Sequence, residues 1–176
     1  MKKIDIDMKK EDKDLQLRDL CGRLPYLPKV HADDGLSPDG KGSDYTLLGI
    51  NANKRIALLG LDFDGVYATY KEYLDNIKPY LRPLSSMTEK EKKDLLNYVV
   101  GKDSKYFEVC SDGSITDMSP DEQDFRTFEL KWINFHPKTT SRYIGWLLKN
   151  HFDFCDLIPK GLALEAPKGM YILNNK

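Results

Sequence analysis

The sequence predicts an α+β protein in which a small antiparallel sheet, made of a meander and a later hairpin, is packed with about three helices. Three observations support this fold class. Residues 45–74 form β-rich runs divided by short turns, three other stretches show helical spacing of apolar residues, and an Asp-Gly turn separates two further β-rich runs. A length of 176 residues favours one domain. We expect it to span residues 14–176 after a flexible charged tail at residues 1–13.

The first helix is expected directly after this tail. Four apolar residues there fall at positions i, i+3, i+4 and i+7 and would share one face: Leu17, Leu20, Cys21 and Leu24. Pro25 should end the helix, because proline lacks an amide proton and disfavours helix in the residue before it. Residues 33–43 contain three glycines and a proline and are expected to form a loop.

The sheet is expected next. Its β-rich runs cover residues 45–50, 55–61 and 66–74. Short turn signals between such runs are typical of an antiparallel meander. The middle run is apolar nearly throughout, which predicts a central strand. Residues 77–86 contain two prolines and should run extended, with Tyr80, Leu81 and Leu84 docked on the core.

The second half of the chain carries clear helix and hairpin signals. Thr88 and Glu91 form a capping box at the start of a helix, and Gly101 suits its C-terminal end. A hairpin is expected around Asp112-Gly113. Another helix start lies at Ser119–Glu122, although the pattern over residues 120–135 leaves helix and strand both open. The last helix is expected over residues 140–150.

Composition narrows the classes of function. The 27 Lys and Arg residues balance 28 Asp and Glu residues, which argues against a protein that binds nucleic acid in bulk. No apolar run is long enough to span a bilayer, and the charged N-terminus lacks the apolar segment of a secretory signal. Three scattered cysteines are too few for a disulfide framework. We therefore expect a cytoplasmic protein with no membrane association and no cofactor.

One motif suggests an enzyme. Residues 61–66, LDFDGV, resemble the first motif of the haloacid-dehalogenase-like phosphatases. The resemblance implies that Asp62 would attack phosphorus and Asp64 would act as a general acid beside Mg²⁺. That fold needs a loop and a helix after the motif, whereas the residues after Gly65 alternate like a strand. Asp-Phe-Asp-Gly is also a good hairpin turn, so the turn is favoured and the phosphatase is the alternative.

A second candidate site combines charge, hydroxyl groups and a helix N-terminus. Its candidate ligand-binding residues are Lys78, Tyr80, Arg82, Ser85, Ser86 and Thr88. A helix N-terminus favours anions because of its free N–H groups and its dipole, and Tyr80 could stack against a planar ring. These features predict a site for a small anionic, nucleotide-like ligand. In the competing interpretation this stretch is a rigid connector, and its hydroxyl groups only cap the helix.

The remaining candidates have weaker support. His151, Asp153 and Cys155 can ligate metals, but His31 and His136 are not at the spacing of a zinc site, so we expect no metal. We also expect no catalytic residue, because no nucleophile–base arrangement is evident. The cysteines Cys21, Cys110 and Cys155 are expected to be small buried hydrophobic residues.

An aromatic platform is the last candidate. It would consist of Tyr67, Tyr70 and Tyr73 with Lys71 nearby, and could stack nucleotide bases. Tyr67 and Tyr73 would share one face of a strand and Tyr70 the other. Packing of a half-buried sheet is the alternative explanation for these tyrosines.

Three stretches carry a family resemblance. Residues 19–26 (DLCGRLPY), 77–88 (IKPYLRPLSSMT) and 151–171 resemble a group of uncharacterised small proteins of anaerobic gut bacteria, their prophages and their phages. The resemblance implies a phage-related accessory protein and supplies no assigned activity or site residue. It suggests a non-enzymatic, anti-defence protein that binds a host factor or sequesters a small anionic ligand. The alternatives are the phosphatase and a structural or assembly protein, with homo-oligomerisation left open.

Overall fold

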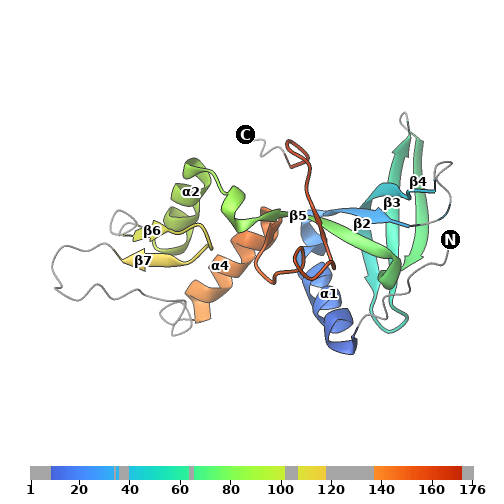
Figure 1. Ribbon diagram of the computed structural model, residues 1–176, viewed down its shortest axis with the longest axis horizontal. Coiled ribbons are helices and arrows are strands. Elements are labelled where there is room, and N and C mark those ends of the chain that lie inside the picture. The colour runs from blue at the N-terminus through green and yellow to red at the C-terminus, as the bar shows by residue number, and fades with distance from the viewer. Residues whose placement is uncertain are drawn as a thin grey trace. The chain divides into compact units, whose positions relative to one another are not determined.

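The computed structural model describes residues 9–33, 35, 40–63, 66–101, 107–117 and 137–171 (Figure 1). The α+β fold is confirmed, with helices and a mostly antiparallel sheet. The chain forms two compact units. Unit 1 comprises Met1–Leu81 and Cys155–Ala166, and unit 2 comprises Arg82–Phe154 and Pro167–Lys176. The one-domain expectation for residues 14–176 stays a prediction, and each unit is described by itself.

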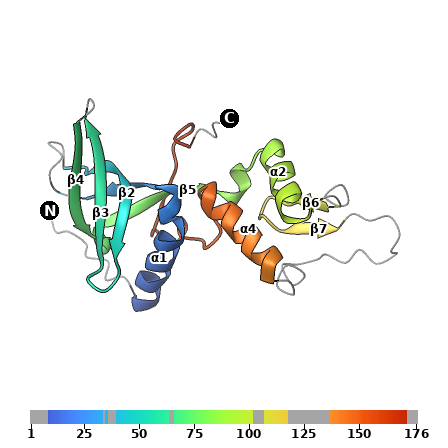
Figure 2. The same cartoon turned by 180° about the vertical axis from the view of Figure 1, so that it is seen from behind.

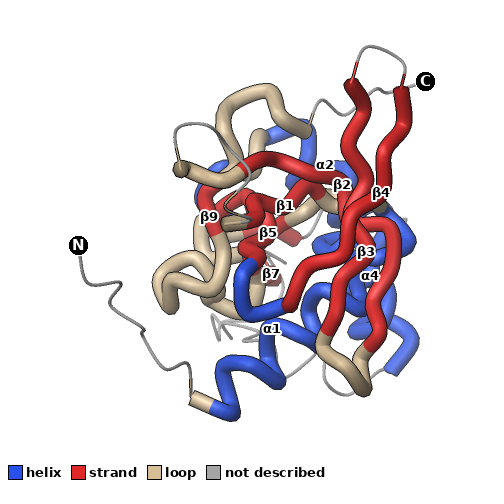
Figure 3. Tube along the Cα trace, turned by 90° about the vertical axis from the view of Figure 1, so that its right-hand side faces the viewer, coloured by secondary structure: helices blue, strands red, loops and turns tan. Residues whose placement is uncertain are grey.

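Unit 1 is built on the sheet. Its strands are β1 (Lys29–Ala32), β2 (Ser43–Asn51), β3 (Ile56–Phe63), β4 (Val66–Tyr73), β5 (Ile77–Pro83, as far as Leu81) and β9 (Leu164–Glu165). Their order is β4-β3-β2-β1-β5, and β9 pairs with β5 in parallel. Strands β2, β3 and β4 form the predicted antiparallel meander, with β3 paired on both sides (Figure 3). The register shifts between Leu47 and Gly49, which marks a β-bulge.

Helix α1 (Lys10–Arg23) and the short 3₁₀ helix η1 (Leu24–Tyr26) precede the sheet. Leu20 of α1 joins a core cluster with alternate residues of the strands: Val30, Ala32, Tyr45, Leu47, Ala57, Leu59, Leu74 and Ile77. A second cluster joins Leu81 of β5 to Leu157, Leu162 and Ala163. Alternation of buried and exposed residues along β1, β2 and β5 therefore places one side of the sheet in the core.

Two predictions about α1 were wrong. The helix begins at Lys10, so residues 10–13 belong to it and not to a flexible tail; Glu11 and Asp12 in its first turn favour the positive end of the helix dipole. On the predicted apolar face, Leu20 is buried and Leu17 and Leu24 pack against the core, but Cys21 is exposed. The buried residues of α1 are Gln16, Asp19, Leu20 and Arg23.

Pairing of polar groups explains how this face is buried. Arg23 donates to both carboxylate oxygens of Asp19 over 2.7 and 2.8 Å, and both side chains have no exposed surface. The Gln16 Nε2 atom donates to the Ile77 carbonyl over 2.9 Å. A buried charge is tolerated when it is paired and hydrogen-bonded, so polar residues are buried beside the predicted apolar face.

Among its described residues, unit 2 contains the helices α2 and α4 and the β6–β7 hairpin (Figure 2), together with a short parallel pair of strands. Its elements are the end of β5 with the 3₁₀ helix η3 (Leu84–Ser86), α2 (Glu89–Val99), β6 (Phe107–Val109), β7 (Ile115–Asp117), α4 (Pro137–Lys149) and β8 (Phe152–Asp153). Their buried side chains form one cluster: Met87, Leu95, Leu96, Val99, Val109, Ile115, Tyr143, Leu147 and Phe152.

Most local predictions for this half are confirmed. The capping box of Thr88 and Glu91 starts α2, and Gly101 follows the helix with a φ of +82°. β6 and β7 form the predicted hairpin, in which Asp112 accepts hydrogen bonds from Ser114. Helix α4 begins at residue 137, three residues earlier than predicted, because proline suits the first position of a helix. The helix start at 119–122 and the region 120–135 lie outside the described residues.

Candidate functional site

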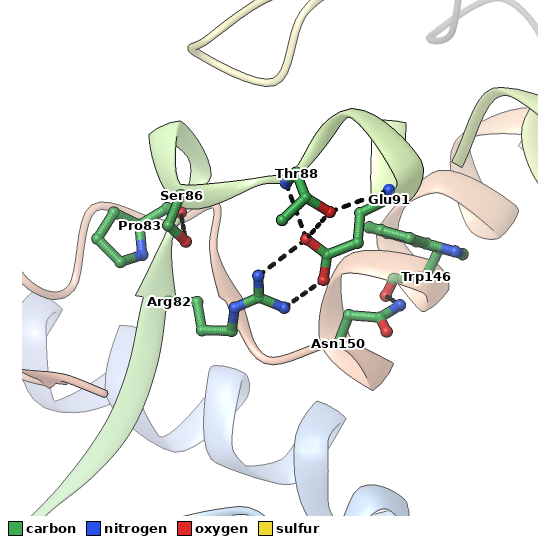
Figure 4. Close-up of polar contacts among 7 residues, drawn as sticks. All are labelled: Arg82, Pro83, Ser86, Thr88, Glu91, Trp146 and Asn150. Atoms are coloured by element: carbon green, nitrogen blue, oxygen red, sulfur yellow. Dashed lines mark hydrogen bonds and ion pairs between the residues drawn. The ribbon is translucent and has the colours of Figure 1, made fainter. Parts of the chain in front are cut away.

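In unit 2, the predicted anion site around Arg82 and Thr88 is occupied by a carboxylate of the protein itself, that of Glu91 (Figure 4). Arg82 donates to the two oxygens of Glu91 over 2.6 and 3.0 Å. The Thr88 amide and hydroxyl groups donate to the same carboxylate over 2.8 and 2.9 Å. The Arg82 guanidinium carbon also lies 4.3 Å from the ring centroid of Phe152. Glu91 thus occupies the position at the α2 N-terminus where an external anion was predicted.

The energetics of this corner are those of a buried ion pair. The side chains of Arg82 and Glu91 are only 16% and 7% exposed. Burial opposes ionisation of Glu91, but hydrogen bonds from Arg82 and Thr88 more than offset it and hold its pKa below the ordinary value. An external anion would have to displace a bidentate, charge-assisted contact. We infer that Arg82 and Thr88 hold the start of α2 against the end of β5.

The other predicted ligand-binding residues have separate surroundings. Lys78 is exposed on β5, and the Tyr80 hydroxyl donates to Asp44 over 2.9 Å. Burial and the Asp44 carboxylate raise the pKa of Tyr80 to about 12. Ser85 is exposed, and Ser86 donates to the Pro83 carbonyl. Lys78 and Tyr80 belong to unit 1, and the other four predicted residues belong to unit 2.

The phosphatase motif does not have the structural context that such an enzyme requires. The backbone of Asp62 lies in β3 and pairs with Tyr67 of β4, while Asp64 and Gly65 lie outside the described residues. The chain continues as strand β4, not as a loop and helix. The antiparallel pairing of β3 with β4 supports the hairpin interpretation of this motif.

The structure also shows the surroundings of the metal-binding and cysteine candidates. Within the described residues, no three His, Cys, Asp or Glu side chains gather where they could hold a metal ion. His151 is buried and stacks on Tyr171, with ring centroids 3.9 Å apart. Cys21 is exposed, contrary to prediction, and Cys110 and Cys155 are half-buried. No helix in the described part of the chain has the length and apolarity needed to cross a membrane.

A different set of residues lines an open pocket in unit 1. The pocket has a volume of about 450 Å³ and is lined by Asn53, Lys54, Arg55, Tyr73, Asp75 and Asn76. These residues come from the turn between β2 and β3, from the end of β4, and from the 3₁₀ helix η2 (Leu74–Asn76). The β3–β4 register and a hydrogen bond from the Leu74 amide to the Arg55 carbonyl bring the two segments together. We call this feature the Arg55 pocket.

Arg55 has unusual geometry in this pocket. Its φ of +50° lies in the left-handed region, which is uncommon for a residue other than glycine or asparagine. Its Nη2 group donates to the Asp75 carboxylate over 3.1 Å and to the Lys13 carbonyl over 3.2 Å. Within the described residues, its buried Nε–H group has no hydrogen-bond acceptor. A buried donor without an acceptor lowers the stability of the folded protein unless another group accepts its hydrogen bond.

The rest of the pocket adds an aromatic ring and further charge. Tyr73 is 62% exposed, although it is a large aromatic side chain. Lys54 is exposed, and in the described part of the chain its ammonium group has no carboxylate partner. Lys13 donates to Asp75 over 2.9 Å. Burial opposes ionisation of Asp75, but the hydrogen bonds and charges of Lys13 and Arg55 outweigh it and lower its pKa.

The predicted tyrosine platform is thus divided. Tyr73 lines the Arg55 pocket, whereas Tyr70 faces the core, stacks on Tyr45 and donates to Glu72 over 2.9 Å. Sequence reasoning interpreted residues 51–54 only as a turn and passed over Lys54 and Arg55 as site residues. The adjacent cations Lys54 and Arg55 at a turn were the available signal in the sequence, but the pocket itself depends on the packing of η2 against that turn.

Comparison with known protein families, curated proteins and solved structures gives no match to this chain.

Proposed function

We propose that this protein is a non-enzymatic binding protein that holds a small anionic ligand with a planar ring, of nucleotide-like chemistry, in the Arg55 pocket. The observation that carries the proposal is the buried Arg55 Nε–H group, which has no acceptor among the described residues. Leaving such a group unsatisfied costs about 1–3 kcal/mol, more for a charged group. A ligand oxygen that accepted this hydrogen bond would recover that free energy on binding.

Backbone strain supports the same assignment. A non-glycine residue in the left-handed region costs about 1–3 kcal/mol, and such residues cluster at ligand-binding sites. Arg55 occupies this conformation at a turn where asparagine or glycine would be cheaper. The strained backbone places Arg55 in the lining of an open pocket, which is the arrangement expected of a ligand anchor.

The neighbouring side chains specify the ligand. The exposed face of Tyr73 is suited to stacking a base or another planar ring, worth about 1–3 kcal/mol. Lys54 and Arg55 favour an anion, while Asn53 and Asn76 add amide donors and acceptors. A nucleotide combines these features. Sequestering such a ligand is consistent with the phage-related accessory role that the family resemblance implies.

The test is a thermal-shift and calorimetry panel of nucleoside monophosphates, cyclic nucleotides and inorganic phosphate. We expect binding by the wild type and a loss of about 10- to 100-fold in affinity for Arg55→Asn, since hydrogen bonds to a charged group contribute about 1.5–3 kcal/mol. Asparagine tolerates the left-handed backbone, so this variant should keep its fold. Tyr73→Leu should weaken the binding of nucleotides and leave the affinity for inorganic phosphate unchanged.

Arg18→Gln is the matched control, because Arg18 is an exposed arginine of α1 outside the pocket. It should bind like the wild type. Unchanged affinity in Arg55→Asn would overturn the site assignment. Absence of binding across the whole panel would remove the ligand function and leave the host-factor and assembly alternatives, which light scattering and partner capture would then separate.

A further inference from the structure

We propose that the Arg55 pocket recognises a terminal phosphate group, a phosphate monoester, and that the Asp75 carboxylate occupies the position of this phosphate until the ligand displaces it. This inference rests on the proposed function and names the ligand class and the regulation of the same site.

The Asp75 carboxylate bridges two cations at the edge of the Arg55 pocket. Its two carboxylate oxygens each meet one cation: Oδ2 lies 2.9 Å from Lys13 Nζ, and Oδ1 lies 3.1 Å from Arg55 Nη2. A carboxylate bridging two cations at the edge of a pocket marks the place where an anion is stabilised. Asp75 is therefore an internal substitute for the anionic group of the ligand.

Asp75 does not accept a hydrogen bond from the Nε–H group of Arg55. Arg55 Nε–H is buried and has no acceptor in the described part of the chain, although the carboxylate sits on the neighbouring Nη2. Three donors thus belong to this position: Lys13 Nζ, Arg55 Nη2 and Arg55 Nε. A carboxylate or a phosphodiester offers two terminal oxygens, whereas a phosphate monoester offers three acceptor oxygens and a charge near −2. The donor set therefore favours the monoester.

Displacing the Asp75 carboxylate from its two cations should cost little free energy. The side chains of Lys13, Asp75 and Arg55 are 30%, 40% and 28% exposed. Ion pairs at such partly exposed positions contribute little to stability and are easily exchanged. Asp75 lies in the short 3₁₀ helix η2 and its side chain is exposed, so it can turn into solvent. An ionised Asp75 left in place would repel the phosphate, and its charge should lower the affinity.

The experiment measures binding of 5′-AMP and 3′,5′-cyclic AMP, and of the corresponding guanine pair, by calorimetry. Wild-type protein should prefer the monophosphate over the cyclic diester by about tenfold or more, since the monophosphate carries nearly one more negative charge and its third terminal oxygen can accept one more charge-assisted hydrogen bond. Asp75→Asn should tighten the monophosphate by about tenfold and the cyclic diester less, because removing a like charge helps the dianion more.

Asp14→Asn is the control, because Asp14 is an exposed acid of α1 and its replacement changes the net charge equally. It should leave both affinities within about twofold of the wild type, as expected for a screened surface charge. Circular dichroism should show that Asp75→Asn keeps its fold.

The outcomes separate the two proposals. Failure of every nucleotide to bind wild-type protein overturns the proposed function. Binding with equal affinity for the monophosphate and the cyclic diester keeps the function and overturns the monoester assignment. Weaker binding by Asp75→Asn would show that Asp75 positions Arg55 for the ligand and does not compete with it, which overturns the displacement mechanism.

Discussion

Replacing Glu91 by alanine should destabilise unit 2 strongly, because Glu91 connects the end of β5 to the start of α2. The substitution removes a bidentate ion pair with Arg82 and one half of the capping box with Thr88. It also deprives Arg82, whose side chain is only 16% exposed in the intact protein, of its carboxylate partner. If this were a surface pair, the loss would be at most about 1 kcal/mol.

Burial changes that magnitude. Removing one partner of a buried ion pair costs about 3–5 kcal/mol, since the remaining charge is uncompensated. The capping contact alone is worth about 1 kcal/mol and overlaps with this figure, because the same carboxylate makes both contacts. Arg82 keeps some exposure and its contact with Phe152, which places the expected loss near the lower end of the range. We predict that the free energy of unfolding falls by about 3 kcal/mol.

Urea denaturation followed by tryptophan fluorescence measures this loss. Trp146 lies in α4 of unit 2 and stacks on Phe152, with ring centroids 5.8 Å apart. A Trp132→Phe background leaves it as the sole probe. Glu89→Ala is the matched control: Glu89 is in the same helical turn, but its side chain is 81% exposed and its ion pair is with the neighbouring Lys92. A loss in Glu91→Ala no larger than in Glu89→Ala would refute the reasoning.

Acid should have the same effect on the wild type. The pKa of Glu91 is lower in the folded state than in the unfolded chain. The stability that its charge contributes is therefore complete above the unfolded pKa and is lost as the pH falls through the folded pKa. Glu91→Gln should lose less stability on acidification than the wild type, and equal pH dependence would contradict this assignment.

Two further predictions concern buried polar groups and left-handed glycines. Arg23→Met should lower the free energy of unfolding by about 3–5 kcal/mol, whereas adding Asp19→Leu should restore most of it; a double variant no more stable than the single one in urea denaturation would argue against a buried ion pair. Gly113→Ala should cost about 2–3 kcal/mol, because the strained φ costs about 1–2 kcal/mol and the new Cβ would lie 3.1 Å from the Leu84 methyl groups. Gly101→Ala has a similar φ with no atom within 4 Å and should show only the backbone cost; equal losses for the two glycines would rule out crowding.

Structural elements that depend on residues close together in the chain could be predicted from the sequence. The capping box of Thr88 and Glu91 depends on a spacing of three residues, and the hairpin at Asp112-Gly113 depends on one turn. The meander follows from β-rich runs joined by short turns, because only adjacent antiparallel pairing is possible with such connections. Each of these predictions needs information only from a short stretch of neighbouring residues.

The errors have a common physical origin. Helical spacing predicted Leu17, Leu20, Cys21 and Leu24 as the buried face of α1. The three leucines contact the core, but Cys21 is exposed and the helix also buries Asp19 and Arg23. Periodicity assumes that burial selects apolar residues, and a paired, hydrogen-bonded charge escapes that rule. A similar pairing occupies Arg82 in the predicted anion site, where Glu91 accepts its hydrogen bonds. Both the cation and the helix N-terminus were correctly located, but a glutamate three residues inside the helix satisfied them.

By itself, the sequence determined the α+β class, the order of strands in the meander and the start of α2, because these depend on local backbone preferences and on short connections. Only the tertiary structure decided which polar groups are free to bind a ligand. Lys13, Arg55 and Asp75 are separated by up to 62 residues along the chain, yet they share hydrogen bonds in unit 1. The availability of a charged group depends on every partner that folding brings to it. Hence Arg82, the obvious cation in sequence, is bound to Glu91, while Arg55 keeps a free buried donor among the described residues.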